Sequence, residues 1–157
     1  MPADIRKEEK GYSARFERHV DRPAEEVWAW LTENEKLTLW FPELGCDDLR
    51  EGGRFKFDMG DGSFEEMRIT GFDRYSLLEY EWGEDSVRFE LAPVANGCRL
   101  TLTERIGKLT DHTPKDLAGW HVCLDAVEAL AEGRGIPDRR EEWQTRYAEY
   151  ASAIRNL

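Results

Sequence analysis

The stretch GWHVCLDAVEAL (Gly119–Leu130) decides the fold, because its apolar residues repeat with the period of an α-helix. The residues at helical spacing on one face are Leu117, Trp120, His121, Leu124, Val127 and Ala131. Pro114 suits a first helical turn and Gly133 suits a helix end, so the pattern predicts a helix from about Thr113 to Gly133. This helix alone has enough apolar surface to cover one face of a sheet.

A sheet is predicted before this helix. Between about Leu49 and Ile106 the apolar period changes to two, and turn residues recur at short intervals. Tyr12–Asp21 alternates in the same way, while Gly60–Gly62 and Asn96–Gly97 have the composition of tight hairpin turns. Consecutive strands joined by short turns indicate an antiparallel meander rather than the βαβ units of a parallel sheet.

Helices are predicted on either side of these strands. One begins at Pro23, a shorter one lies around Glu35–Trp40, and a tail helix has Asp138 as its N-cap. One side of the tail helix carries Trp143, Tyr147, Tyr150 and Ile154. We therefore expect an α+β fold: a curved antiparallel sheet of about six or seven strands grips the long helix. Two short helices follow the first strand, and an extra helix follows the long one.

Length and charge limit the function. The chain has 157 residues and a formal charge of −11. We expect a single domain over 1–157, with a core at about 12–132 and an additional helix within 133–157. The negative charge disfavours nucleic acid and anionic membranes as partners. No stretch is long and apolar enough for a membrane span, and residues 1–12 lack the apolar region of a signal peptide, so a cytoplasmic location is expected.

Motifs for cofactor, metal or nucleophile chemistry are missing from the sequence. The cysteines, Cys46, Cys98 and Cys123, are far apart and match no metal spacing, as expected of reduced thiols. The histidines, His19, His112 and His121, form no HxxxH or HExxH pattern, and GxSxG, P-loop and GxGxxG motifs are also missing. We therefore expect no cofactor and no metal.

Three segments resemble the SRPBCC superfamily with its START-like, helix-grip fold. They are FERHVDRPAEEVWAWLTENEKLTLWF (Phe16–Phe41), GGRFKFDMGDG (Gly52–Gly62) and Gly119–Leu130. Within the superfamily the chain is most similar to the group related to the C-terminal domain of the activator of the heat-shock-protein-90 ATPase, over roughly Tyr12–Glu132. The resemblance implies a hydrophobic cavity between sheet and long helix. Members bind apolar small molecules, some are cyclases or dehydratases, and the co-chaperone relatives bind a chaperone.

The leading functional hypothesis is binding of an apolar or amphipathic small molecule in that cavity. The alternatives are a co-chaperone-like protein-interaction domain and a cyclase- or hydrolase-type enzyme that uses the same cavity. A homodimer is a further expected assembly, since twofold pairs are the commonest oligomers. The residues predicted to contact ligand are Trp40, Phe57, Met67, Tyr80, Trp82, Phe89, Trp120, His121 and Leu124.

Three polar residues fall on apolar faces, and each has two interpretations. His121 is either a hydrogen-bonded core histidine or a polar contact in the cavity. Glu104 is either a strand end that reaches water or a carboxylate at the cavity mouth, where a pair with His121 could do acid–base catalysis. Arg18 either extends its charge to solvent past a packed stem, which we prefer, or meets a carboxylate partner or an anionic ligand. Acidic runs such as Glu65–Glu66 and GEDS (83–86) are interpreted as solvated faces and hairpin tips.

Overall fold

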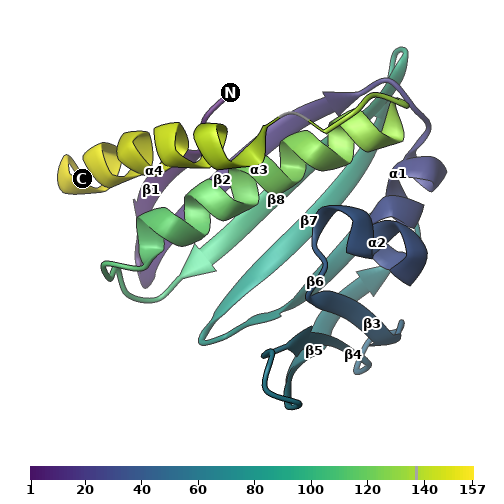
Figure 1. Cartoon of the computed structure of the whole chain (residues 1–157), viewed down its shortest axis with the longest axis horizontal. Helices are drawn as coiled ribbons and strands as arrows, with labels where there is room; N and C mark the ends of the chain where they lie inside the picture. Colours follow the sequence, from purple (N-terminus) through teal and green to yellow (C-terminus); the bar gives the residue numbers. More distant parts are fainter. Residues whose placement is uncertain (137) are drawn as a thin grey trace.

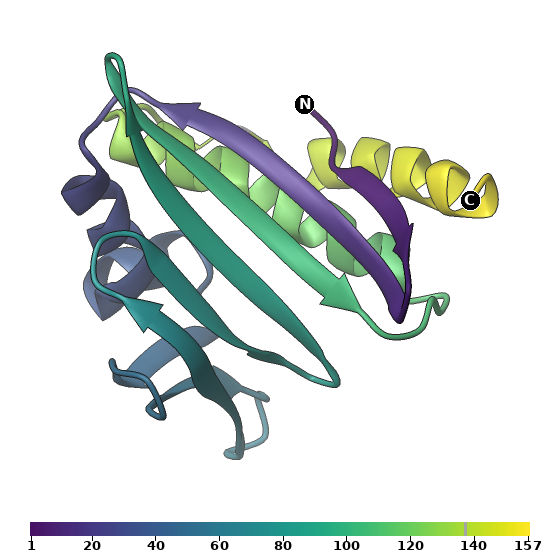
Figure 2. The same cartoon turned by 180° about the vertical axis from the view of Figure 1, so that it is seen from behind.

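The eight strands among the described residues form one antiparallel sheet, in the order β1-β2-β8-β7-β6-β5-β4-β3 (Figures 1 and 2). The structure is a computed structural model that describes residues 1–136 and 138–157. The strands are β1 (Asp4–Glu8), β2 (Gly11–Val20), β3 (Leu44–Asp48), β4 (Arg54–Asp58), β5 (Phe64–Asp73), β6 (Leu77–Trp82), β7 (Asp85–Val94) and β8 (Gly97–Ile106). The helices are α1 (Ala24–Thr32), α2 (Asn34–Trp40), α3 (Thr113–Ala131) and α4 (Arg139–Arg155).

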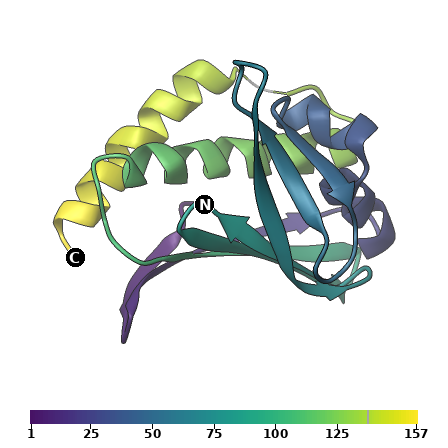
Figure 3. The ribbon, with the colours of Figure 1, turned by 90° about the horizontal axis from the view of Figure 1, so that it is seen from below.

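The long helix α3 lies across the inner face of the curved sheet, and α4 covers the outer side of α3 (Figure 3). The short helices α1 and α2 follow β2 and close one end of the sheet, while strands β3 to β5 curl toward α3 (Figures 1 and 3). This is the predicted α+β helix-grip arrangement, and the predicted long helix, two short helices and extra C-terminal helix are all confirmed.

The core lies between the sheet and α3. Strands β2 and β8 alternate buried and exposed side chains along much of their length, as a half-buried sheet requires. Their inward residues Phe16, Leu100 and Leu102 are fully buried, and so are Leu117 and Val127 on the facing side of α3. The alternation in the sequence therefore identified the inner face of the sheet correctly.

The sheet has more strands than expected because two of them lack an alternating pattern. Strand β1 reads DIRKE and is mostly exposed, and its one apolar residue, Ile5, is too little to mark a strand. It pairs with β2 through a turn at Gly11, whose φ of +99° favours glycine. A side chain at Gly11 would also collide with the carbonyl oxygen of Ile106. Strand β3 reads LGCDD and has an irregular register between Cys46 and Asp48.

Helix α4 packs along α3 and begins with the predicted N-cap. The Asp138 carboxylate accepts a hydrogen bond from the Arg140 backbone N–H at 3.1 Å. Tyr150 on the predicted apolar side is buried, and Trp143, Tyr147 and Ile154 are partly buried against the core. Among the described residues, no helix combines the length and apolar character that crossing a bilayer requires.

We expect the substitution Asp138→Ala to lower the free energy of unfolding by about 1 kcal/mol, because it removes the acceptor for an otherwise unpaired N–H at the start of α4. Urea denaturation followed by circular dichroism measures this change. Asp111→Ala, which alters an exposed aspartate before α3, is the matched control and should change stability much less. Equal losses in the two variants would contradict the capping role.

Candidate functional site

A pocket of about 550 Å³ lies where the first turn of α3 meets β4 and β5, the β6–β7 turn and the end of β8. Its apolar wall comprises Phe57, Met59, Met67, Trp82 and Ile106. Four carboxylate residues also line it: Glu65, Glu84, Asp85 and Asp116. The lining contains only two side chains that can carry positive charge, Lys108 and His112. The size is that of small-molecule sites, and the lining combines apolar surface with negative charge.

The strands place the apolar wall. Met67 on β5 is buried and forms the floor, whereas Met59, just after β4, is 52% exposed and lies at the rim. Phe57 on β4 is partly buried beside them. At the end of β6, Gly83 has a φ of +63°, a turn conformation that favours glycine. This turn brings Glu84 and Asp85 to the lining directly after Trp82.

Trp82 joins the sheet to α3 at the pocket wall. Its Nε1–H donates a hydrogen bond to Asp116 Oδ1 at 2.9 Å. Its ring packs against the Trp120 ring, with centroids 4.9 Å apart, and edge-on against Phe57 at 6.2 Å. The indole is therefore held in one orientation, and Asp116 is held with it.

The acidic side of the pocket is also fixed in place. Asp85 accepts a hydrogen bond from the Gly107 backbone N–H at 3.0 Å. Burial raises the pKa of Asp85 above its usual value, and the nearby charges of Asp116 and Glu84 add to this effect, while the Gly107 N–H opposes it. The pocket therefore favours ligand groups that are neutral hydrogen-bond donors or positively charged over ligand anions.

Glu104 lies behind this wall, fully buried on β8. Burial raises its pKa well above the usual range, and the proximity of Asp116 and Asp85 raises it further. As a carboxylate, Glu104 has no hydrogen-bond donor among the described residues, but as a neutral acid its O–H can donate a hydrogen bond to the Asp116 carboxylate. Glu104 therefore belongs with Asp116 at the pocket wall, in surroundings that favour its neutral form over its charged form.

Of the residues predicted to contact ligand, Phe57, Met67 and Trp82 line the pocket. The others are largely buried in the interior and lie outside its lining: Trp40, Tyr80, Phe89, Trp120, His121 and Leu124. Aromatic rings fill the space beneath Trp120, where the hollow was expected. Tyr80 stacks with Phe55 at 4.4 Å, and Phe89 meets Trp120 edge-on at 5.8 Å. The pocket consequently lies nearer the start of α3.

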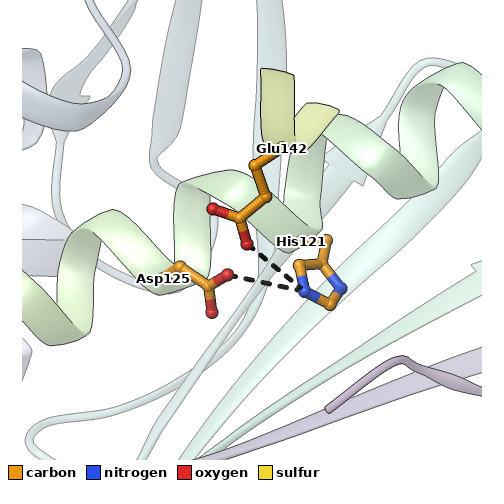
Figure 4. A group of neighbouring side chains, drawn as sticks. All are labelled: His121, Asp125 and Glu142. Carbon is orange, nitrogen blue, oxygen red and sulfur yellow. Dashed lines mark ion pairs between the residues drawn. The ribbon is translucent and has the colours of Figure 1, made fainter. Parts of the chain in front are cut away.

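His121 points away from the pocket, toward α4. Its Nδ1 and the Tyr150 hydroxyl are 2.7 Å apart, and its Nε2 faces Asp125 and Glu142 (Figure 4). Burial is the main reason that the pKa of His121 falls to about 4. The carboxyl groups beside Glu104 are Asp116 and Asp85, so the structure does not form the catalytic pair of Glu104 with His121 considered above.

Arg18 meets a carboxylate instead of extending into solvent. Its side chain is 5% exposed, and its Nε–H donates to Asp125 Oδ1 at 2.9 Å. The preferred interpretation, in which the Arg18 charge reaches solvent, is therefore wrong, and the one with a carboxylate partner holds.

The acidic lining was missed as a site feature. Glu65 and the GEDS turn were interpreted as solvated surface, and Asp116 was not singled out. Their grouping depends on the curl of β4 and β5 toward α3, which residue spacing does not encode. The one sign in the sequence was the number of carboxylates in segments next to apolar positions. Acidic faces exposed to solvent have the same composition, so this sign could not identify a pocket.

Comparison with solved structures supports the fold over nearly the whole chain. EF2215, a conserved protein of unknown function from Enterococcus faecalis, has 25% identity and a TM-score of 0.89, covering 99% of this chain and 91% of that one. CalU16 from Micromonospora echinospora has 22% identity and a TM-score of 0.73, covering 96% and 94%. The protein encoded by gene BPP1335 from Bordetella parapertussis has 22% identity and a TM-score of 0.74, covering 96% and 90%.

No protein with a curated description matches the chain. The family described as "Activator of Hsp90 ATPase homolog 1-like protein" matches residues 21–132, which include α1, α2, strands β3 to β8 and α3. The match leaves β1, β2 and α4 outside, although the Enterococcus faecalis structure covers nearly the full length. Together with the helix-grip fold, this match shows that the chain belongs to the Activator of Hsp90 ATPase homolog 1-like family of the SRPBCC superfamily.

Proposed function

We propose that this protein binds an apolar or amphipathic small molecule in the pocket at the start of α3. The observation that carries the proposal is the pocket of about 550 Å³, whose wall of apolar side chains faces a set of carboxylates. The apolar wall contributes affinity through burial, at roughly 25 cal/mol for each Å² before the losses of association. The carboxylates Asp85 and Asp116 select the polar part of the ligand.

The charge of the lining narrows the ligand class. Glu65, Glu84, Asp85 and Asp116 outnumber the single lysine in the lining, Lys108. An anionic head group placed there would meet like charges, whereas an amine or a hydroxyl group would find acceptors. We therefore favour a neutral or cationic amphipathic molecule over a fatty acid or a phosphate ester.

The pocket favours ligand binding over the two alternatives. A pocket of this size supports the ligand-binding hypothesis, whereas the aromatic rings packed beneath Trp120 fit the protein-interaction alternative. The enzymatic alternative relied on a pair of Glu104 and His121. Glu104 lies beside Asp116 at the pocket wall, whereas the His121 ring faces Tyr150 on α4. Native mass spectrometry of freshly purified protein for a bound small molecule tests the proposal directly.

A matched pair of fluorescent probes tests the charge preference. N-phenyl-1-naphthylamine is neutral, and 1-anilinonaphthalene-8-sulfonate has the same ring system with an anionic group. We expect the neutral probe to bind more tightly, and Trp82 in the lining supplies an energy-transfer donor for the measurement. Equal or tighter binding of the sulfonate would contradict the assignment of the acidic side of the pocket.

Met59→Gln tests the location. Met59 lies at the pocket rim, so replacing its thioether with an amide removes apolar contact without disturbing the core. We expect the neutral probe to bind about fivefold more weakly, which corresponds to the loss of about 1 kcal/mol from roughly 40 Å² of apolar burial. Leu39→Gln is the control, because Leu39 on α2 is 55% exposed and lies outside the pocket lining. Unchanged affinity in Met59→Gln, or equal losses in both variants, would place the probe elsewhere.

A further inference from the structure

We propose that His121, Asp125 and Glu142 form a binding site for one zinc ion between α3 and α4. The site is separate from the pocket at the start of α3, because none of its three residues lines that pocket. One ligand atom from each residue can be chosen so that all three lie within 4.8 Å of one another. Figure 4 shows both carboxyl groups directed toward the same edge of the imidazole ring.

The distances fit a site that closes around an ion. His121 Nε2 is 3.4 Å from Asp125 Oδ2 and 4.0 Å from Glu142 Oε1. Zinc lies about 2.0–2.2 Å from imidazole nitrogen and carboxylate oxygen, so donors around it are separated by roughly 3–3.5 Å. His121 and Asp125 are one turn apart on α3 and already close to that spacing. Only the Glu142 side chain, partly exposed on α4, has to move inward.

The buried nitrogen of His121 is the second, independent observation. His121 is fully buried, and its Nε2 has no hydrogen-bond partner within the described part of the chain. Buried polar atoms are rarely left unpaired in folded proteins. The Tyr150 hydroxyl oxygen accepts a hydrogen bond from the Ala3 backbone N–H at 2.8 Å and lies 2.7 Å from His121 Nδ1. In the tautomer with the proton on Nδ1, the imidazole donates to that same oxygen and the Nε2 lone pair faces the carboxylates. Metal-binding histidines commonly use their second nitrogen in this way.

The surrounding groups hold the carboxylates in place. Arg18 Nε–H donates to Asp125 Oδ1 at 2.9 Å, which leaves Oδ2 directed at His121. The second carboxylate, Glu142, approaches the same imidazole nitrogen from α4, so a divalent cation between the two side chains would offset the repulsion of their negative charges.

Positive charge nearby sets a limit on affinity. Arg18 lies on the far side of Asp125, and Arg146 Nε is 3.9 Å from Glu142 Oε1 while its Nη1 pairs with Glu149 at 2.9 Å. The N-terminal amino group also contributes positive charge at His121. Two carboxylates and one imidazole are nitrogen and oxygen donors of the kind that zinc binds. The nearby positive charges lower the affinity of the site for any cation. The partly exposed Glu142 leaves a path from solvent, since it lines a surface hollow of about 390 Å³ along α4.

The test is a titration of the full-length chain, stripped of metal with a chelator, with zinc chloride. Imidazole ¹⁵N resonances of His19, His112 and His121 are followed by NMR, and the dissociation constant is measured by competition with a zinc indicator. We expect saturation at one zinc per chain, with the largest resonance shift at His121 Nε2. Glu142→Gln should weaken zinc binding at least tenfold. Glu141→Gln, its exposed neighbour on α4, is the control and should bind as the unaltered chain does.

Two results would overturn the proposal. One is zinc binding that does not saturate, or that shifts His19 or His112 instead of His121. The other is equal affinity in the Glu142→Gln and Glu141→Gln variants. Circular dichroism establishes that both variants fold, which is expected because both side chains reach the surface of α4. A thermal midpoint that rises with zinc in the unaltered chain and stays constant in Glu142→Gln would further support an ion that links α4 to α3.

Discussion

Truncation of Trp120 to alanine is expected to lower the free energy of unfolding by about 3–5 kcal/mol, the range for large aromatic residues in packed cores. Trp120 is buried on α3, and three aromatic rings surround it. The ring centroids of Trp82, Phe41 and Phe89 lie 4.9, 5.8 and 5.8 Å from that of Trp120. Since these rings come from the sheet and from the segment after α2, Trp120 holds α3 to both, and its removal leaves a void that they cannot easily fill.

Urea denaturation of the two proteins, followed by circular dichroism, measures this loss. Trp143→Ala is the matched control, because Trp143 on α4 is only partly buried at the edge of the core. We expect the control to lose less than half as much stability as Trp120→Ala. A loss below about 1 kcal/mol for Trp120→Ala would mean that the rings around it can collapse into the vacated space. The interior beneath α3 would then be loosely packed.

Most of the fold could be predicted because it depends on local periodicity. The helical spacing around Trp120 gave α3 its position, and the alternation of Phe16 with Arg15 and Glu17 marked β2. Strand β1 could not be predicted, since its sequence DIRKE has one apolar residue, Ile5, and the strand exists through pairing with β2. Which strand pairs with which is decided in the folded chain, and a short charged segment carries no residue pattern that indicates its pairing.

The interior arrangement could be predicted only in part. The pattern identified which residues are buried, as it did for Tyr80 and Phe89. Whether such rings line a cavity or fill it depends on how far the sheet curves, which periodicity does not report. The two carboxylates that face His121 were missed for a related reason. Asp125 is one helical turn away, but Glu142 comes from α4, which reaches His121 only because the chain reverses after α3.

The second large effect concerns pH and Glu104. We expect Glu104→Gln to be more stable than the unaltered protein at pH 8, and the difference between the two proteins to shrink as the pH falls toward 4. Burial and the nearby Asp116 raise the pKa of Glu104 well above its usual value. At pH 8 the folded, unaltered chain therefore either buries a charged carboxylate or holds a proton that the unfolded chain has released. Glutamine is neutral at every pH, has nearly the same shape, and can donate its amide N–H to Asp116 as the protonated acid does.

The sign follows from proton binding in the two states. A carboxyl group whose pKa is raised in the folded state holds its proton to higher pH than it does when unfolded. Above the unfolded pKa of about 4.3, the unfolded state therefore gains stability relative to the folded one with each rise in pH. The Glu104 contribution then falls by up to about 1.4 kcal/mol for each pH unit until the pH reaches the folded pKa. Other groups titrate in both proteins, so their contributions largely cancel in the difference.

Free energies of unfolding of both proteins, measured by urea denaturation at intervals between pH 4 and pH 8, give this difference. Glu51→Gln, at an exposed turn before β4, serves as the control and should keep a constant difference from the unaltered protein over the same range. A Glu104→Gln difference that stays flat, or that favours the unaltered protein at pH 8, would show that Glu104 is ionised and well solvated in the folded state. The expected result would instead show a carboxyl group that lowers stability at neutral pH beside the pocket wall. Such a group is a candidate for a role in the pocket rather than in folding.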